Sequence, residues 1–173
     1  MKKRTGLLMF AIAIALVVLS GIGPVGGARA AAPHAYAGKR ITISLSRERL
    51  RAWEGNKVLL VTPVTTGDAA LPTPTGYFTV FAKRSPYTFI SPFPAGSRFW
   101  YPPSTVSFAL EFAAGGYFIH DAPWRGVFGP GSNAGSQPGT NYGGTHGCVN
   151  VPYSAARWLY YWAGIGTTVH VVR

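Results

Sequence analysis

The stretch THGCVN, residues 145–150, contains Cys148, the only cysteine among the chain's 173 residues. A lone cysteine serves as a small buried apolar side chain, as a metal ligand or as a nucleophile. The paired Cys or His spacings that are typical of zinc sites are absent from the sequence. The glycines around Cys148 also leave few side chains that would bury it. The sequence therefore favours a nucleophile and predicts neither a metal nor another cofactor.

A cysteine nucleophile needs a base that reaches its thiol and donors that stabilise an oxyanion. Because Gly147 has no Cβ, the chain can turn so that the backbone N–H groups of Gly147 and Cys148 converge on one point. His120 ends a predicted strand in YFIHDAPW (117–124), from which its ring would project at the rim of a sheet. His170, in a predicted terminal strand, is the one candidate downstream and is expected to be structural. We therefore predict His120 as the base.

The segments on either side of this motif mostly follow strand patterns. Ile41, Ile43 and Leu45 alternate with polar residues, and Gly55-Asn56 marks a two-residue hairpin turn. The other segments with strand-like composition are 58–65, 77–83, 106–110, 117–120 and 167–172.

One helix is predicted after the cysteine, in PYSAARWLYYWAG (152–164). Ser154 is expected to be its N-cap and Gly164 its stop. The predicted fold class is therefore mainly β with a single helix.

Two long connections interrupt the strands. Residues 84–112 are rich in proline and aromatic residues and are predicted to be an irregular excursion between strands. Residues 125–144 contain seven glycines and no aliphatic run, so we expect a mobile flap beside the thiol. Phe128 and Tyr142 are its candidate contacts with substrate.

The N-terminal segment has the layout of a secretory signal. Three basic residues precede an apolar run over 7–19, and small residues near position 30 suit a cleavage site. We expect residues 1–30 to be a signal peptide, or else an uncleaved membrane anchor, followed by a short linker (31–37) and one domain (38–173). Either version predicts an exported, extracytoplasmic protein.

The charge is strongly basic, with 16 Lys+Arg against 5 Asp+Glu. Four of the basic residues and none of the acidic ones lie in residues 1–30, which leaves about +7 on the predicted domain. Such a charge favours anionic wall polymers or a membrane surface. Nucleic acid is not expected, because no Lys/Arg-rich run follows the signal. We expect a monomer.

The two motifs together resemble the signature of the L,D-transpeptidase catalytic domain family, which has a histidine, a loop, and then Ser/Thr-His-Gly-Cys-hydrophobic-Asn or Arg. YFIHDAPW and THGCVNV follow this pattern. Residues 41–80, including TPTG (73–76), are similar to the family's opening strands, and residues 154–172 are similar to its closing helix and strand. The resemblance covers residues 38–173 and implies the family's β-sandwich or barrel-like catalytic fold.

The resemblance also implies a reaction, the cross-linking of peptidoglycan stem peptides. Cys148 would attack the carbonyl of the donor's third residue, terminal D-alanine would leave, and an amine of another stem would resolve the thioester into a 3–3 link. His120 would be the general base and acid, oriented by the backbone carbonyl of Asp121. Backbone N–H groups near His146, Gly147 and Cys148 would form the oxyanion hole.

Supporting roles are implied for the remaining motif residues. Thr145 takes the Ser/Thr place, and His146 and Asn150 are expected to shape the turn rather than take part in the chemistry. Trp100 and Tyr101 are candidate aromatic residues of a lid over the donor site.

Two alternative functions stay open at this point. With water as the acceptor, the same chemistry would make an L,D-carboxypeptidase that trims stem peptides. A basic wall-binding module without activity would keep the fold, although such a module has no need of a free exported thiol.

Overall fold

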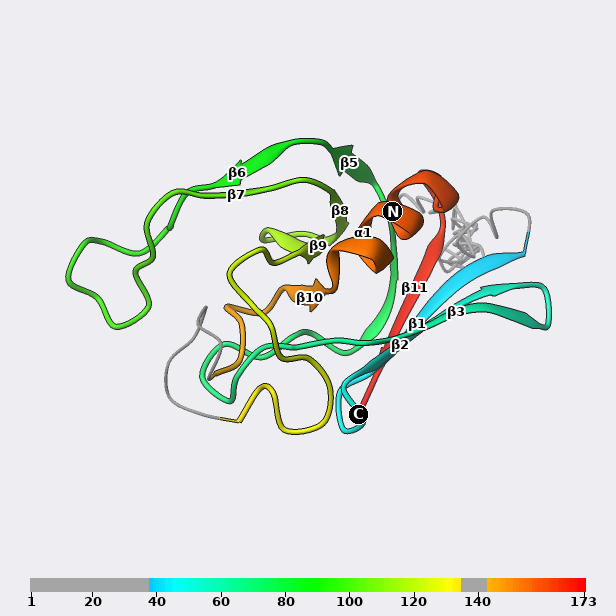
Figure 1. The fold of residues 1–173 in the computed structure, drawn as a ribbon, viewed down its shortest axis with the longest axis horizontal. Coiled ribbons are helices and arrows are strands. Elements are labelled where there is room, and N and C mark those ends of the chain that lie inside the picture. The colour runs from blue at the N-terminus through cyan, green and yellow to red at the C-terminus, as the bar shows by residue number, and fades with distance from the viewer. Residues whose placement is uncertain (1–37, 135–142) are drawn as a thin grey trace, which may run out of the picture. The chain divides into compact units, whose positions relative to one another are not determined.

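A computed structural model describes residues 38–134 and 143–173. Within these ranges the chain forms two main β-sheets, a two-stranded hairpin and one α-helix (Figure 1). This confirms the predicted mainly β fold with a helix after Cys148. No helix in the described ranges is long and apolar enough to cross a membrane. The predicted signal or anchor (1–30) and linker (31–37) lie outside them.

The first sheet has five strands in the order β3-β2-β1-β11-β4. Its members are β1 (Lys39–Ser44), β2 (Arg49–Glu54), β3 (Lys57–Pro63), β4 (Gly76–Thr79) and β11 (Thr168–Val172). The alternation in β1 buries Ile41 and Ile43 completely. The predicted Gly55-Asn56 turn joins β2 to β3 and is confirmed, with Gly55 at φ +56°. The last strand, β11, pairs in parallel with β1 in the interior of this sheet.

The second sheet has four strands in the order β10-β9-β8-β5. Its members are β5 (Ala82–Arg84), β8 (Ala109–Ala113), β9 (Tyr117–Asp121) and β10 (Val149–Val151). β10 runs parallel to β9, and their register places Asn150 opposite His120. The pairing therefore brings the cysteine motif next to the strand that carries the predicted base.

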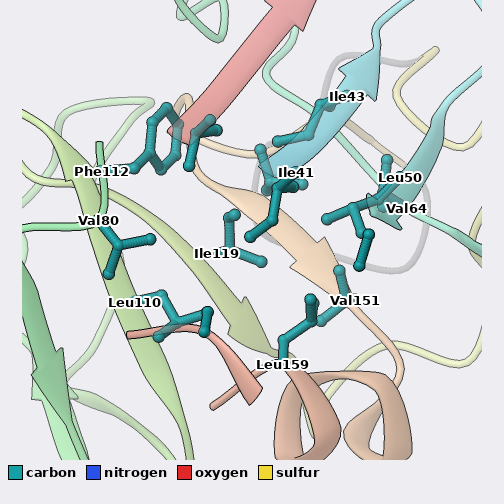
Figure 2. Close-up of a cluster of buried hydrophobic side chains, with 14 of the residues drawn as sticks. Ile41, Ile43, Leu50, Val64, Val80, Leu110, Phe112, Ile119, Val151 and Leu159 are labelled. Carbon is teal, nitrogen blue, oxygen red and sulfur yellow. The ribbon is translucent and has the colours of Figure 1, made fainter. Parts of the chain in front are cut away.

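The two sheets and the helix share one hydrophobic core (Figure 2). Ile41 from β1, Ile119 from β9 and Leu159 from the helix are each at most 1% exposed. Burying a side chain of this size contributes about 1.5–3 kcal/mol. Because residues from β9 and β10 are part of this core, the strands that carry the candidate site are firmly held.

The helix α1 (Tyr153–Trp162) follows β10 directly. The predicted Ser154 cap is wrong, because Pro152 occupies the N-cap position and no side chain caps the helix. Proline fixes φ near the value that helix entry needs, so Ser154 falls inside the first turn. The helix ends at Trp162, before Gly164, as predicted.

The segment between β5 and β8 is more regular than predicted. It contains a hairpin of β6 (Tyr87–Phe89) and β7 (Ser104–Val106), which extends away from the sheets in Figure 1. The single strand predicted over 106–110 is also wrong, because the chain breaks between β7 and β8. The Asp121 carboxylate accepts hydrogen bonds from the backbone N–H groups of Ser107 and Phe108 at 2.8–3.1 Å. These N–H groups therefore bond to a side chain instead of a neighbouring strand.

Candidate functional site

The β6–β7 hairpin and the loop between its strands (residues 87–106) are called the arm below. A pocket of about 240 Å³ lies where this arm meets the edge of the second sheet. Cys148 and His120 both line it, so the structure brings the predicted nucleophile and base to one cavity. The lining residues are Phe89, Tyr101, Pro102, Ser104, His120, Trp124, Thr145, His146, Cys148 and Asn150.

His120 lies in β9, is 3% exposed, and has a partner on each ring nitrogen. Its Nδ1 lies 2.6 Å from the backbone oxygen of Asp121, and its Nε2 lies 3.0 Å from the amide nitrogen of Asn150. Since a carbonyl oxygen only accepts, Nδ1 carries the proton and Nε2 accepts from Asn150. This arrangement fixes both the tautomer and the ring orientation.

The environment of His120 keeps the imidazole neutral. Burial lowers its pKa to about 4, although the backbone hydrogen bond and the charge of Asp121 oppose this shift. The positive charge of Arg125 adds to the lowering. At neutral pH the ring is therefore uncharged and holds a free-base Nε2 at the edge of the pocket.

Cys148 is half-buried at the start of β10, next to an apolar cluster that contains Phe118. Its Sγ lies 3.5 Å from the backbone oxygen of Gly116, which accepts from the thiol. Burial raises the pKa of the Cys148 thiol to about 12, and the charge of Glu111 raises it further, against a lowering by the backbone of Phe118. The thiol is therefore protonated in the empty site.

The turn before Cys148 depends on glycine. Gly147 has φ +105°, and a Cβ at this position would lie 2.6 Å from Cε1 of Tyr117. The Thr145 hydroxyl donates to the backbone oxygen of Cys148 at 2.5 Å, and Thr73 donates to that of Gly147 at 2.9 Å. These bonds hold the turn from two sides.

The structure corrects one part of the expected oxyanion hole. The N–H of Gly147 donates to Thr145 Oγ1 at 3.0 Å, so it is not free to bind an oxyanion. The N–H of Cys148, by contrast, has no acceptor within the described residues. The N–H of His146 likewise has none, so the available donors at this turn are those of Cys148 and His146.

His146 and Asn150, which were predicted to shape the turn, also make contacts beyond it. Asn150 is 2% exposed and contacts His120, as described above. His146 Nε2 lies 2.9 Å from the backbone oxygen of Phe99, and its ring centroid is 4.8 Å from that of Tyr101. His146 thus ties the arm to the cysteine turn. Burial lowers its pKa.

The two candidate lid residues separate in the structure. Tyr101 lines the pocket, and burial raises the pKa of its phenol, with the neighbouring Cys148 as a further cause. Trp100 is 45% exposed and is not among the lining residues. Phe89 of β6, which the sequence did not single out, lies 4.8 Å from the His120 ring. The arm therefore supplies two aromatic walls to the pocket, Phe89 at the end of β6 and Tyr101 in the loop before β7.

The prediction of a flap with little to bury is wrong for residues 125–134. Ser132 is 8% exposed, and its hydroxyl lies 2.6 Å from Thr65 Oγ1 and 3.3 Å from the Glu48 carboxylate. The Asn133 N–H also donates to Glu48, which is 2% exposed. The loop is held by polar groups around a buried carboxylate, which an absence of aliphatic residues did not reveal.

The two aromatic residues named in this loop did not gain a role. Phe128 is half-buried and is not among the pocket-lining residues, and Tyr142 lies outside the described residues.

Arg125 was not singled out from the sequence, yet it lies close to the site. It is 6% exposed, and its Nη2 donates to the backbone oxygen of Gly143 at 2.8 Å. Its Nε and Nη1 have no partner within the described residues. The one signal in the sequence was its position directly after HDAPW, the segment that contains the predicted base.

His170, the alternative base, lies elsewhere. It belongs to β11 of the first sheet, where its ring stacks on Tyr77 with centroids 3.9 Å apart, and it does not line the pocket. Across residues 38–134 and 143–173, no three His, Cys, Asp or Glu side chains gather in a way that could hold a metal ion.

Comparison with known proteins gives consistent results. The family model described as the L,D-transpeptidase catalytic domain matches residues 38–171. L,D-transpeptidase 2 of Mycobacterium tuberculosis is 31% identical over 117 residues, which is 64% of this chain and 25% of that protein. This chain therefore spans only a quarter of that relative's length.

Solved structures of similar proteins share the fold. An L,D-transpeptidase from Mycobacterium smegmatis aligns with a TM-score of 0.65 and 27% identity, over 79% of this chain and 59% of that one. The L,D-transpeptidase LdtMt1 in complex with imipenem aligns with a TM-score of 0.65 and 25% identity, over 78% and 59%. Because the family model covers nearly the whole described domain, this chain belongs to the L,D-transpeptidase catalytic domain family.

Proposed function

We propose that this chain is a peptidoglycan L,D-transpeptidase that forms 3–3 cross-links through a thioester on Cys148. The observation that carries the proposal is the placement of Cys148 and His120 in one pocket, with the imidazole tautomer fixed by Asp121. Membership of the family and the 31% identity to a transpeptidase support the reaction class.

In the proposed acylation step, Cys148 Sγ attacks the carbonyl of the donor's third residue. Its proton passes to His120 Nε2, which accepts because Nδ1–H is held by the Asp121 carbonyl. The tetrahedral oxyanion faces the N–H of Cys148, which, like that of His146, has no other partner among the described residues. Collapse of the intermediate expels D-alanine, whose amine takes the proton from the imidazolium.

The opposite pKa shifts of the two groups decide the order of events. Burial lowers the pKa of His120 and raises that of Cys148, so a thiolate–imidazolium pair is disfavoured in the empty pocket. Proton transfer then accompanies the attack on the carbonyl instead of preceding it. The donor peptide must also turn the thiol away from the Gly116 oxygen that it contacts at rest.

In the second step the amine of another stem peptide attacks the thioester. His120 now takes a proton from that amine and returns it to the departing sulfur, so the enzyme is regenerated. Aromatic walls from Phe89, Tyr101 and Trp124 would exclude water during the lifetime of the thioester. We therefore favour transfer to an amine over hydrolysis.

The proposed setting is the cell wall outside the cytoplasm, as for the family. The basic composition, with 16 Lys+Arg against 5 Asp+Glu, would keep the protein close to anionic wall polymers or lipid head groups. The proposal needs no cofactor, since the thiol, the imidazole and a backbone donor supply each proton and charge in the two steps.

The test is mass analysis of muropeptides after incubation of purified tetrapeptide stems with the protein. We expect dimers that lack one D-alanine, and no dimers with Cys148→Ala. If only trimmed monomers form, the protein is an L,D-carboxypeptidase, and if neither product forms with folded protein, it is a non-catalytic module.

A covalent probe gives an independent reading of the nucleophile. A related transpeptidase has been captured with imipenem, so we expect intact mass to rise by one imipenem per chain. The increase should disappear in Cys148→Ala and persist in His170→Ala.

A further inference from the structure

The outward face of α1 is aromatic, although the outward face of a surface helix is normally charged. Tyr153 and Tyr161 are 58% and 71% exposed, and Ser154 and Arg157 between them are exposed as well. The opposite face packs Ala155, Ala156 and Leu159 into the core. Tyr153 and Tyr161 contact the core ring of Phe108 only at centroid distances of 5.8 and 5.9 Å, and more than half of each side chain stays exposed. Aromatic side chains gathered at the surface indicate a binding surface.

This face is hollowed into a second groove, of about 570 Å³, separate from the Cys148 pocket. Its walls are Tyr153, Ser154, Arg157, Trp158, Tyr161 and Trp162. The indole rings of Trp158 and Trp162 stack at 5.1 Å with an interplanar angle of 19°, which makes a flat aromatic wall. The buried Nε1 of Trp162 has no acceptor within the described part of the chain.

The charged groups of this groove are cationic. Arg157 lies with its guanidinium 5.9 Å from the Tyr161 ring, and it has no ion pair within the described residues. Lys39 does not line the groove but contacts one of its lining residues, with Nζ 5.4 Å from the Trp162 ring and 3.1 Å from the Trp162 carbonyl oxygen. No acidic side chain is among the lining residues. The groove is therefore complementary to an anion.

A sugar polymer that carries carboxylates fits this combination. The C–H face of a pyranose ring stacks on flat aromatic walls, its hydroxyls bond to phenol and serine hydroxyls, and a carboxylate pairs with a guanidinium through two hydrogen bonds. A membrane surface is less well matched, because Arg157 is the one basic side chain among the lining residues, whereas helices that lie on a membrane carry several Lys or Arg side chains on their polar face. A protein partner would need more contact area than one ten-residue helix offers.

We propose that the α1 groove binds a carboxylate-bearing glycan strand, namely a stretch without stem peptides, and so with free lactyl carboxylates, in the sugar backbone of the polymer whose neighbouring peptides react in the Cys148 pocket. The choice of polymer rests on the proposed function, whereas the binding itself does not involve Cys148. Docking of a glycan on α1, which directly follows β10, would hold stem peptides near the pocket and raise their local concentration.

The experiment measures binding of peptide-free glycan strands, with their lactyl carboxylates exposed, to the full chain carrying Cys148→Ala. Tyr161→Ser and Arg157→Gln should each raise Kd by about tenfold or more, the loss typical of removing an aromatic or arginine anchor. Both side chains are exposed, although Tyr161 touches the core ring of Phe108, so urea denaturation of each variant checks that the fold is kept. Tyr77→Ser and Arg47→Gln, at exposed positions outside the groove, are the matched controls and should bind as the parent does.

Three results with glycan probes would overturn the inference. These are no binding of the glycan, equal loss in groove and control variants, and equal binding of neutral chitin oligosaccharides, which lack the carboxylate. Groove-dependent binding to phosphatidylglycerol vesicles without glycan binding would also overturn it, in favour of a membrane. Imipenem acylation is measured separately, on the protein that keeps Cys148. Failure to bind glycan would therefore leave the proposed reaction intact. Glycan binding without acylation would refute the proposed reaction and leave the groove proposal intact.

Discussion

Replacing Gly147 by alanine tests whether the turn before Cys148 is built as the structure indicates. The added Cβ would lie 2.6 Å from Cε1 of Tyr117, 3.2 Å from its Cδ1 and 3.4 Å from the oxygen of Pro72. Residues other than glycine also rarely adopt a backbone conformation with φ +105°. Two separable costs are therefore expected, one from the backbone and one from the contact.

The backbone cost alone can be measured at Gly96, which has φ +88° and open space around its missing Cβ. A non-glycine residue in the left-handed region costs roughly 1–2 kcal/mol, so Gly96→Ala should lose about that much. Gly147→Ala should lose about 1–3 kcal/mol more of the free energy of unfolding, because the added Cβ forces the packed Tyr117 ring to move. The difference between the two variants isolates the contact.

Urea denaturation gives the free energy of unfolding, and the rate of imipenem acylation gives the position of the thiol. A displacement of the nucleophile by about 1 Å costs on the order of 100-fold in rate, so Gly147→Ala should be acylated about that much more slowly. Gly96→Ala should be acylated at the normal rate. Equal unfolding free energies for the two variants, together with normal acylation of Gly147→Ala, would refute the described turn.

Three other perturbations have equally definite outcomes. His120→Ala should abolish imipenem acylation, whereas His170→Ala should keep it; the reverse would move the catalytic pair to the terminal strand. Ser132→Ala should lower the free energy of unfolding by about 1–3 kcal/mol in urea titrations, because it leaves the buried Glu48 carboxylate short of a donor, and an unchanged value would mean that the loop is not held there. Because His120 has a folded pKa of about 4 and an unfolded value near 6.5, the unfolded chain binds more protons between these values, and stability should fall as pH drops from 6.5 to 4, by up to roughly 3 kcal/mol. The raised pKa of Cys148 should likewise make stability fall as pH rises from 9 to 12, and a calorimetric Tm that is flat across both windows would contradict the buried neutral pair.

Short-range patterns sufficed for the parts of the fold that depend on neighbours in sequence. The alternation of Ile41 and Ile43 predicted a strand with one buried face, and Gly55-Asn56 predicted its hairpin, since both rules act over a few residues. The break between β7 and β8 depends instead on the Asp121 carboxylate, which reaches back 13–14 residues from a later strand. A local pattern contains no information about such a bond.

The candidate site divides along the same line. The motif residues His120 and Cys148 were found because the chemistry requires those residue types and the family motif gives their order, and they line one pocket. The contact of His146 with the Phe99 carbonyl spans 47 residues, and that of Glu48 with Ser132 spans 84. Both contacts depend on tertiary structure. For this reason the sequence predicted only a role in the turn for His146, and it predicted that the loop containing Ser132 would have little to bury.

The two pKa shifts in the pocket bear on how a lone thiol would stay reduced in the proposed extracytoplasmic setting. Oxidation and disulfide exchange proceed through the thiolate, so burial that raises the pKa of Cys148 to about 12 protects the sulfur in an oxidising compartment. The same burial would disable the nucleophile if the thiolate had to form first. A neutral His120, whose Nε2 is free to accept once Asn150 releases it, resolves this conflict by removing the proton during the attack itself. On the proposed mechanism the substrate carbonyl, and not the local pH, therefore triggers formation of the reactive sulfur.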